Sequence, residues 1–351
     1  MAANIKKIIY MHPRIDATAG HIRAARSDID MTIHPFSAPQ DETWTVMAQA
    51  HGYHVCSRVE LEEPWFPDGK LIPKAPNLLA VCSLGAGYDV IDVDACNAAG
   101  ILVCNQSGGN AEAVAEHALG FMLALSKKIV LSDRAMRKQS DLDRFLYTGN
   151  DVVGKTVGII GLGNIGGRVA ELCKGLFRMT VLAYDPYLTK EQMAAKGAQK
   201  VELAELLPRV DYLTMHCPRT TETFGMMGYA QFAAMKPSAY FVNTSRGGTY
   251  KEEDLVQILK EKKIAGAGLD VFLDEPPPTD HPLMAFDNVI VSPHNAGITH
   301  EAMANVSKIA ADQWIDILDG RVPPRLINRE VWPKYMERFE RVMGFKPAAL
   351  G

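Results

Sequence analysis

The chain has 351 residues, of which 47% are hydrophobic and 22% charged, and its formal net charge is −4 at pH 7. This length suits two domains with sizeable cores, and the composition is typical of a soluble globular protein. The small negative charge gives no electrostatic reason to expect a nucleic acid or an acidic membrane surface as a partner.

Cysteine usage and the lack of long apolar stretches favour a cytoplasmic protein. No two cysteines form a C-x-x-C pair, and no zinc-ligand spacing of Cys and His is present, so we expect reduced core thiols and no metal site. No segment has the apolar core of a signal peptide or the roughly twenty apolar residues of a membrane span. The six cysteines are Cys56, Cys82, Cys96, Cys104, Cys173 and Cys217.

The N-terminal third alternates short apolar runs with helical patterns. Strands are predicted at 7–11, 78–83 and 101–104, which together indicate a small α/β unit. A long amphipathic helix is predicted from Asn110, a good N-cap residue. The polar stretch 138–150 then leads to a glycine-rich unit, and we expect the chain to cross into a second domain before that unit.

A glycine-rich motif directly follows a buried strand. The apolar run 157–160 leads into Gly161, Gly163 and Gly166, which form G-x-G-x-x-G, and helical spacing begins inside the motif. These glycines permit a tight turn, a close approach of a pyrophosphate to the helix N-terminus, and close helix–strand packing. A second apolar run then ends in Asp185, at about the spacing expected for a dinucleotide site.

Asp185 favours NAD over NADP. Its carboxylate can accept from both ribose hydroxyls of NAD and would repel the 2′-phosphate of NADP. The following residues, Pro186 and Tyr187, provide no Arg for that phosphate. The alternative is that Asp185 ends a strand by chance.

Beyond Asp185 the alternation of strands and helices continues, which predicts a parallel sheet covered by helices on both faces. The tail after residue 320 shows no pattern that places it. Strands are predicted at 211–216, 239–243, 265–269 and 289–291, and helices at 252–262 and 299–318.

Three polar residues follow consecutive predicted strands: Arg246, Glu275 and His294. The carboxyl ends of parallel strands line the ligand crevice, so all three are expected near a bound nicotinamide. A His beside a carboxylate can give and take the proton that accompanies hydride transfer, and an Arg can hold a carboxylate and polarise a carbonyl. Taken singly, the residues also fit a surface ion-pair Arg, a solvated loop acid and a turn-capping His.

These features lie within a longer series of motifs, in order SLGAGYDVID, NAEAVAEHALGFMLAL, GKTVGIIGLGNIGGRVA, HCPRTTET, FVNTSRGG, GLDVFLDEP and VSPHNAG, from about Leu79 to Ile309. In these motifs the chain resembles the D-isomer-specific 2-hydroxyacid dehydrogenases, which include D-lactate, glycerate, hydroxypyruvate and 3-phosphoglycerate dehydrogenases. The resemblance implies an NAD-dependent oxidoreductase that moves a hydride between nicotinamide and a small D-2-hydroxy acid or 2-keto acid.

The resemblance also implies an architecture. It consists of two Rossmann-like α/β domains with parallel sheets. A discontinuous substrate domain would comprise residues 1–107 and 299–351, and the inserted dinucleotide-binding domain would comprise residues 108–298. Homodimers are usual in such proteins.

The resemblance further implies site residues. Arg246 would hold the substrate carboxylate and keto oxygen, and His294, paired with Glu275, would be the proton donor and acceptor. Asp270 would bind the nicotinamide carboxamide. The backbone at Leu84, Gly85 and Ala86 would also bind the carboxylate, and the cofactor would contact Gly161, Gly163, Asn164, Ile165, Gly166, Asp185, His216, Cys217, Pro218, Thr223, Thr244, Ser245 and Asp270.

Residues that differ from those of related dehydrogenases narrow the range of expected substrates. Glu275 argues against formate dehydrogenase, where a Gln is found, and the loop at 84–86 lacks the Lys of phosphite dehydrogenases. Arg58 is offset from the arginines of 3-phosphoglycerate enzymes, so a phosphorylated substrate is disfavoured, although Arg58 and His54 leave it open. Arg219, where a Leu is common, weakens the expectation of strict NAD preference. An NAD-sensing transcriptional corepressor, known on the same scaffold, is the alternative from another class.

Overall fold

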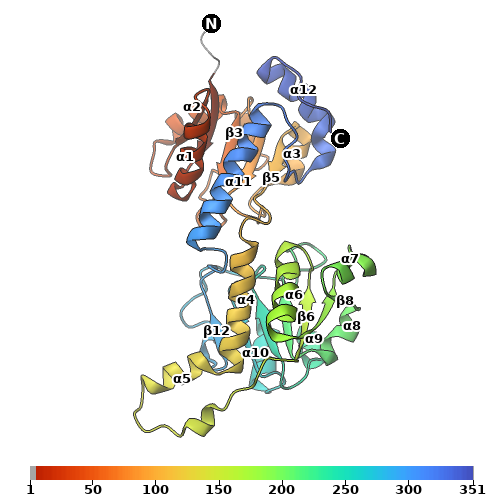
Figure 1. Ribbon diagram of the computed structural model, residues 1–351. Helices are drawn as coiled ribbons and strands as arrows, with labels where there is room; N and C mark the ends of the chain where they lie inside the picture. The colour runs from red at the N-terminus through yellow and green to blue at the C-terminus, as the bar shows by residue number, and fades with distance from the viewer. Residues whose placement is uncertain (1–4, 351) are drawn as a thin grey trace. The chain divides into compact units, whose positions relative to one another are not determined.

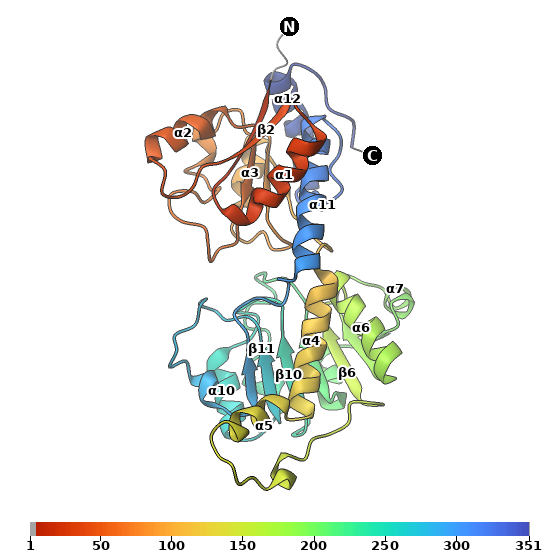
Figure 2. The same cartoon turned by 60° about the vertical axis from the view of Figure 1, so that its left-hand side comes forward.

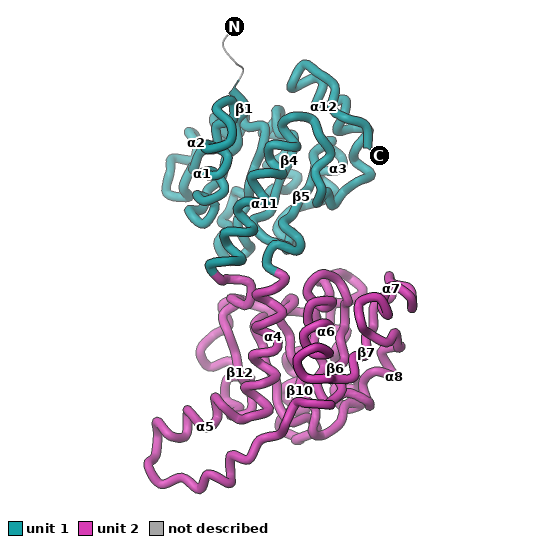
Figure 3. The backbone as a smooth tube through the Cα atoms, viewed as in Figure 1, with its two compact units in different colours: residues 1–110, 300–351 teal, residues 111–299 magenta. Residues whose placement is uncertain are grey.

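The computed structural model describes residues 5–350, and the chain forms two compact units (Figure 1, Figure 3). Unit 1 comprises residues 1–110 and 300–351, and unit 2 comprises residues 111–299. Each unit is an α/β structure built on a parallel sheet, so the predicted fold class is confirmed. The substrate and dinucleotide roles assigned to the two parts stay predictions at this point.

Unit 1 contains a five-stranded parallel sheet in the order β2-β1-β3-β4-β5. Three of its strands lie where the sequence predicts strands, whereas β2 and β3 had no strand prediction of their own. The bounds are β1 Lys6–Tyr10, β2 Ile29–Ile33, β3 Gly52–Val55, β4 Ala80–Ser83 and β5 Leu102–Cys104.

Helix α11 packs beside α1 and covers this sheet with a large aromatic side chain. Trp314 lies over β3, where a Cβ on Gly52 would come within 2.5 Å of its ring, so only glycine fits beneath it. The tail after residue 320, for which the sequence predicts no structure, contains helix α12. Arg338 of this helix donates to the carbonyls of Leu78 and Ala99. The helices of unit 1 are η1 Pro13–Ile15, α1 Asp16–Ala25, α2 Gln40–Gln49, η2 Ile72–Lys74, α3 Val93–Ala99, α11 His300–Leu318, η6 Arg329–Val331 and α12 Trp332–Met343.

The core of unit 1 encloses a neutral histidine. The His54 side chain is fully buried, and its Nδ1 accepts a 2.9 Å hydrogen bond from the indole N–H of Trp314. Burial lowers the pKa of His54 to about 3. A protonated ring would place an N–H against the indole donor, so the folded unit requires the neutral form.

This histidine makes the stability of the protein acid-sensitive. Between pH 3 and 6.5 the unfolded chain binds a proton at His54 that the folded chain does not, so stability falls as the pH is lowered through this window. The full effect is roughly 5 kcal/mol, of which about 2 kcal/mol is lost by pH 5. We expect His54→Leu to destabilise the protein at pH 7.5 by about 1–3 kcal/mol, because the Trp314 N–H loses its acceptor.

Denaturant unfolding of wild type and His54→Leu at pH 7.5 and pH 5 tests this expectation. The variant should lose less stability than wild type between the two pH values, by about 2 kcal/mol. An identical loss in both proteins would show that His54 is not the group that titrates.

Unit 2 contains a seven-stranded parallel sheet in the order β12-β11-β10-β9-β6-β7-β8. The strand order reverses between β6 and β9, which makes this a doubly wound sheet. The predicted strands are confirmed to within two residues, and β8 was not predicted. The bounds are β6 Thr156–Ile160, β7 Thr180–Tyr184, β8 Gln199–Lys200, β9 Tyr212–Met215, β10 Tyr240–Asn243, β11 Gly266–Leu269 and β12 Val289–Val291.

Successive residues of these strands face opposite sides, so the sheet separates two apolar cores. Val157 and Ile159 of β6 belong to a core shared with α4 and α6, whereas Ile160 belongs to one shared with α9 and α10. Figure 2 shows α4 running along one face of the sheet, where it contacts β10 and β11. The helices of unit 2 are α4 Ala111–Ser126, α5 Ile129–Met136, η3 Arg144–Tyr147, α6 Asn164–Phe177, α7 Lys190–Ala195, α8 Leu203–Leu206, η4 Leu207–Arg209, α9 Tyr229–Ala233, α10 Glu252–Lys260 and η5 Pro282–Ala285.

All six cysteines are buried and carry free thiols, as the sequence predicts. Over residues 5–350, no helix combines the length and the apolar composition needed to cross a bilayer. The same residues contain no group of three or more His, Cys, Asp or Glu side chains arranged to hold a metal ion.

Candidate functional site

Nearly all of the predicted site residues of unit 2 lie just past the carboxyl ends of its strands. The loops after β6 and β9 flank the point where the strand order reverses, the usual ligand position in such sheets. The loops after β10, β11 and β12, which are neighbours in the sheet, carry Arg246, Glu275 and His294 respectively.

The glycine loop after β6 has the geometry that a dinucleotide needs. Gly161 has φ +87°, and a Cβ there would lie 2.7 Å from the Cys217 nitrogen in the loop after β9. A Cβ on Gly166 would lie 2.1 Å from the Gly161 oxygen, so helix α6 approaches the strand closely. At Gly163, by contrast, an added Cβ would meet nothing within 4 Å. The open space therefore lies at the N-terminus of α6, where a pyrophosphate fits.

Two substitutions separate packing from binding at this loop. Gly163→Ala is expected to fold like wild type and to weaken NADH binding, because the new methyl group fills only the open space. Gly166→Ala is expected to lower the melting temperature, because its methyl group collides with the Gly161 carbonyl. Thermal unfolding and NADH fluorescence titration measure the two effects, and an unchanged NADH affinity in Gly163→Ala would contradict this placement.

Asp185, half-buried after β7, is fixed beside the glycine loop. Its Oδ2 accepts from the Leu162 N–H at 2.9 Å, and its Oδ1 accepts from the Tyr187 N–H at 3.0 Å. The Tyr187 hydroxyl in turn donates to Glu222 at 2.8 Å. Two carboxylates therefore lie in this region, which suits ribose hydroxyls and disfavours a phosphate.

The loop after β9 carries a neutral histidine and a protonated thiol. Burial lowers the pKa of His216 to about 3 and raises the pKa of Cys217 to about 11. The His216 Nε2 lies 2.9 Å from the Thr214 hydroxyl. Thr223 donates to the Pro218 carbonyl at 2.7 Å and so closes the turn that follows.

The loop after β10 is built around Asn243 and holds Arg246. The Arg246 carbonyl accepts from Asn243 Nδ2 at 3.3 Å and from Thr249 Oγ1 at 2.8 Å, and its guanidinium donates to the Ser245 carbonyl at 2.7 Å. Thr244 and Ser245 are buried. The backbone that carries the arginine is thus fixed by its own loop.

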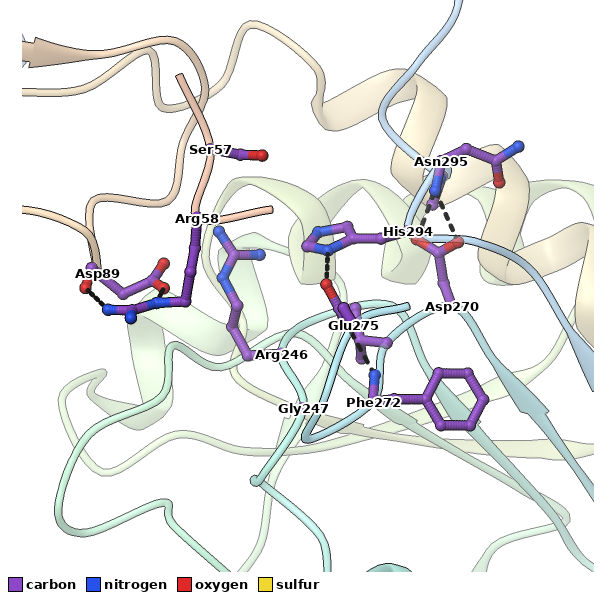
Figure 4. A network of polar contacts seen from close by, with 12 residues as sticks. Ser57, Arg58, Asp89, Arg246, Gly247, Asp270, Phe272, Glu275, His294 and Asn295 are labelled. Atoms are coloured by element: carbon purple, nitrogen blue, oxygen red, sulfur yellow. Dashed lines mark hydrogen bonds and ion pairs between the residues drawn. The ribbon is translucent and has the colours of Figure 1, made fainter. Parts of the chain in front are cut away.

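Glu275 and His294 form a close pair (Figure 4). Glu275 Oε2 lies 2.6 Å from His294 Nδ1, and Glu275 Oε1 accepts from the Phe272 N–H at 3.0 Å. The His294 side chain is 36% exposed and that of Glu275 is 17% exposed. The carboxylate is therefore set by its own loop, and the histidine ring extends from it toward solvent.

Asp270, at the end of β11, holds the loop that carries His294. Its carboxylate is buried and accepts from Ser292 Oγ at 2.5 Å and from the N–H groups of Asn295 at 2.9 Å and Ala296 at 3.0 Å. Ser292 Oγ lies 3.0 Å from Nε2 of His117 on α4. Neither Ser292 nor His117 was predicted as a site residue; for His117, the signal in the sequence is a polar residue on the apolar face of the helix predicted from Asn110.

Glu252, also not predicted as a site residue, binds both ends of the loop that carries Glu275. Its Oε1 accepts from the Leu273 N–H at 2.7 Å, and its Oε2 lies 3.0 Å from Nε2 of His281. Glu252 is the first residue of α10, so its negative charge also interacts favourably with the positive end of the helix dipole.

The residues whose backbone is predicted to bind the substrate carboxylate, Leu84, Gly85 and Ala86, belong to unit 1. The Leu84 N–H donates to the Val55 carbonyl at 2.8 Å, and the carbonyls of Gly85 and Ala86 accept from Gln106 N–H and Asn105 Nδ2. This loop after β4 is therefore rigidly held. Its contact with a carboxylate stays a prediction.

His54, which together with Arg58 left a phosphorylated substrate open, is not available as a phosphate ligand. His54 is enclosed in the core and bound by Trp314, so it offers no ligand for a phosphate. Arg58 donates to the Asp89 carbonyl at 2.7 Å and lies over the Phe66 ring, beside a cavity of about 320 Å³ whose lining also includes Asp68. Four of the eight lining residues are acidic and one is basic, so this cavity does not favour a phosphate.

Comparison with known proteins agrees with this geometry. Residues 119–296 match the sequence model of the D-isomer specific 2-hydroxyacid dehydrogenase, NAD binding domain. A D-3-phosphoglycerate dehydrogenase from Archaeoglobus fulgidus is 42% identical over 261 residues, 74% of this chain and 49% of that protein. The chain thus spans about half the length of this relative. A glyoxylate reductase from Korarchaeum cryptofilum is 38% identical over 267 residues, 75% of this chain and 80% of that protein.

Solved structures show the same fold. The D-lactate dehydrogenase from Aquifex aeolicus, complexed with NAD and lactic acid, is 28% identical, with a TM-score of 0.77 over 92% of this chain and 99% of that one. The match to an NAD binding domain and the glycine loop of unit 2 together identify the cofactor as a nicotinamide dinucleotide. On this sequence and structural evidence, the chain belongs to the D-isomer-specific 2-hydroxyacid dehydrogenase family.

Proposed function

We propose that the protein is an NAD-dependent oxidoreductase that interconverts a small 2-keto acid and the corresponding D-2-hydroxy acid. The observation that carries this proposal is the 2.6 Å pair of Glu275 and His294 in the loops after β11 and β12, beside the loop after β10 that carries Arg246, in the unit that holds the glycine loop. A general acid, its carboxylate partner and a carboxylate-binding cation are the groups that this reaction needs.

His294 is the proton donor in the reducing direction. A nicotinamide held at the glycine loop and Asp270 would supply the hydride for C2 of the keto acid, and the carbonyl oxygen would then need a proton. Because Nδ1 of His294 is engaged by Glu275, its Nε2 delivers the proton to that oxygen. The Glu275 carboxylate fixes the tautomer and stabilises the imidazolium before transfer, and oxidation reverses each step.

Arg246 binds the substrate carboxylate and polarises the adjacent carbonyl. Its planar guanidinium offers paired N–H donors, which match a carboxylate and concentrate positive charge where the keto oxygen becomes negative. The loop contacts of its backbone carbonyl fix the main chain that carries this cation, and the guanidinium itself donates to the Ser245 carbonyl at 2.7 Å.

Asp270 has acceptor capacity for the nicotinamide carboxamide. A carboxylate has about four lone-pair sites, and the loop donors use two on Oδ1 and one on Oδ2. The remaining site on Oδ2 suits a carboxamide N–H. The same residue would thus position both the cofactor ring and the His294 loop.

Asp185 supports a preference for NAD over NADP. Both of its carboxylate oxygens accept from backbone N–H groups. Tyr187, which supplies one of these groups, also donates its hydroxyl to Glu222. A 2′-phosphate would meet this negative charge with the oxygen atoms of Asp185 unable to turn aside.

Consumption of NADH with a panel of keto acids tests the proposed function. The panel comprises glyoxylate, hydroxypyruvate, pyruvate, phenylpyruvate, 2-ketoisocaproate and 3-phosphohydroxypyruvate, repeated with NADPH. We expect turnover with one or two of the unphosphorylated acids and a lower kcat/KM with NADPH. Tight NADH binding without turnover of any acid would contradict the proposal and favour the corepressor alternative.

We further propose that the protein is a homodimer through unit 2. Helix α5 has no buried residue, and the segment that follows extends from the unit (Figure 1). Phe145 and Leu146 in this segment are 72% and 70% exposed, and Ile129 and Met136 of α5 are exposed as well. Exposed large apolar side chains gathered on one segment are typical of a protein interface.

Light scattering coupled to size-exclusion chromatography tests the dimer. We expect a dimeric mass for wild type and a monomeric mass for Phe145→Glu/Leu146→Glu. Leu176→Glu, at an exposed apolar site on α6, is the matched control and should remain dimeric. A monomeric wild-type protein would disprove this assembly.

A further inference from the structure

We propose that His117 and Ser292 are positioning residues for the general acid, and that they act through Asp270 on the loop 292–296. This inference rests on the proposed function for its kinetic consequence, whereas its structural core concerns only how the loop is held. His117 lies on α4, Asp270 after β11 and Ser292 after β12, so three elements of unit 2 meet at one carboxylate.

The hydrogen bonds in this chain have one consistent direction. An ionised carboxylate only accepts, so Ser292 donates its hydroxyl proton to Asp270 Oδ1 at 2.5 Å. The Ser292 oxygen is then left to accept, and His117 Nε2 at 3.0 Å must be its donor. His117 therefore completes the polar chain, and its ring is oriented by an edge-on contact with Phe121 at 4.7 Å between ring centroids.

The loop needs this support because its backbone is strained. His294 has φ +53°, in the left-handed region that side chains other than glycine rarely adopt. Such a conformation is energetically unfavourable and persists only where the surroundings fix it. Asp270 provides the restraint: its carbonyl accepts from the His294 N–H at 2.9 Å, and its carboxylate accepts from the two amides that follow.

The consequence falls on the His294 ring. Its 2.6 Å contact with Glu275 depends on the ring leaving the loop in the observed direction, which the left-handed conformation sets. Without the Ser292 donor, Asp270 Oδ1 loses a partner and the carboxylate is free to rotate away from the amides of Asn295 and Ala296. The general acid would then sample orientations in which it does not meet the substrate.

Two pairs of matched variants test this role. His117→Leu and Ser292→Ala remove the link, whereas His117→Gln keeps an N–H donor near the position of Nε2 and Ser292→Thr keeps the hydroxyl. Hydrogen exchange of the peptide that covers 292–297 reads the loop directly, and thermal unfolding and NADH titration read folding and cofactor binding. Turnover is measured on whichever keto acid the wild type reduces.

We expect His117→Leu and Ser292→Ala to lower kcat by roughly 10- to 100-fold. Exchange at 292–297 should rise at least tenfold in both, with KM for the keto acid and global unfolding changed little. His117→Gln and Ser292→Thr should restore slow exchange and most of the turnover. The double variant His117→Leu/Ser292→Ala should be no worse than the more impaired single variant, because both break one link.

Unchanged exchange at 292–297 in His117→Leu and Ser292→Ala would overturn the inference, whatever their activity. Equal impairment of the leucine and glutamine variants would also overturn it, since it would indicate a packing role for residue 117. If the wild type reduces no keto acid, the exchange measurement still decides the structural link, so failure of the proposed function is distinguishable from failure of this inference.

Discussion

Replacing His294 with asparagine is expected to lower kcat by about 10²–10⁴, the range associated with loss of a general acid. NADH binding should stay near that of wild type, because the glycine loop and Asp185 are carried by other strands. Asparagine keeps a polar side chain and tolerates the left-handed conformation at this position, so the fold should be retained. Single-turnover kinetics with NADH measure the loss directly.

His21→Asn is the matched control, since His21 is an exposed histidine on α1 in unit 1. Its turnover should equal that of wild type. Turnover of His294→Asn within a few-fold of wild type would show that His294 is not the general acid. Glu275 would then be left only with its structural hydrogen bond to the Phe272 N–H.

The second large effect is expected at Arg246. Arg246→Gln should lower kcat/KM by about 10²–10³, comparable with the loss of a donor to a developing oxyanion. Arg246→Lys keeps the charge but loses the paired donors, so it should lie between glutamine and wild type. A steady-state comparison of the three proteins on one keto acid gives both KM and kcat.

The division of the Arg246 effect between KM and kcat is informative. Binding of the carboxylate alone would raise KM and leave kcat unchanged, whereas polarisation of the carbonyl would also lower kcat. We expect both to change. Full activity of Arg246→Gln would contradict its assignment as the carboxylate anchor.

Much of unit 2 could be predicted from the sequence because its strands are buried on both faces. The run before Gly161 and the run before Asp185 are continuous apolar stretches, and both form strands where predicted. Strand β3 of unit 1 is equally buried, but its sequence GYHV contains a glycine and a histidine. Both residues are explained by a tertiary contact that the local sequence does not show: Gly52 leaves room for the Trp314 ring, and His54 accepts the Trp314 hydrogen bond.

The candidate site shows the same division. The placement of Arg246, Glu275 and His294 after successive strands could be predicted, because parallel strands bring their carboxyl ends to one edge. The support beneath them could not. His117 lies about 150 residues before Asp270 in the sequence, and Glu252 begins a helix rather than following a strand, so only the folded sheet brings them to the loops they hold.

Transfer of deuterium from [4,4-²H₂]NADH, which carries the label on both faces of the nicotinamide, to the product tests the central claim most directly. A keto acid accepted by the wild type is reduced with the labelled cofactor, and the product is examined by mass spectrometry and chiral chromatography. The proposed function predicts a D-2-hydroxy acid with one deuterium at C2, formed by wild type and nearly absent with His294→Asn. NADH oxidation without deuterium in a hydroxy acid product, or with the L isomer, would contradict the account.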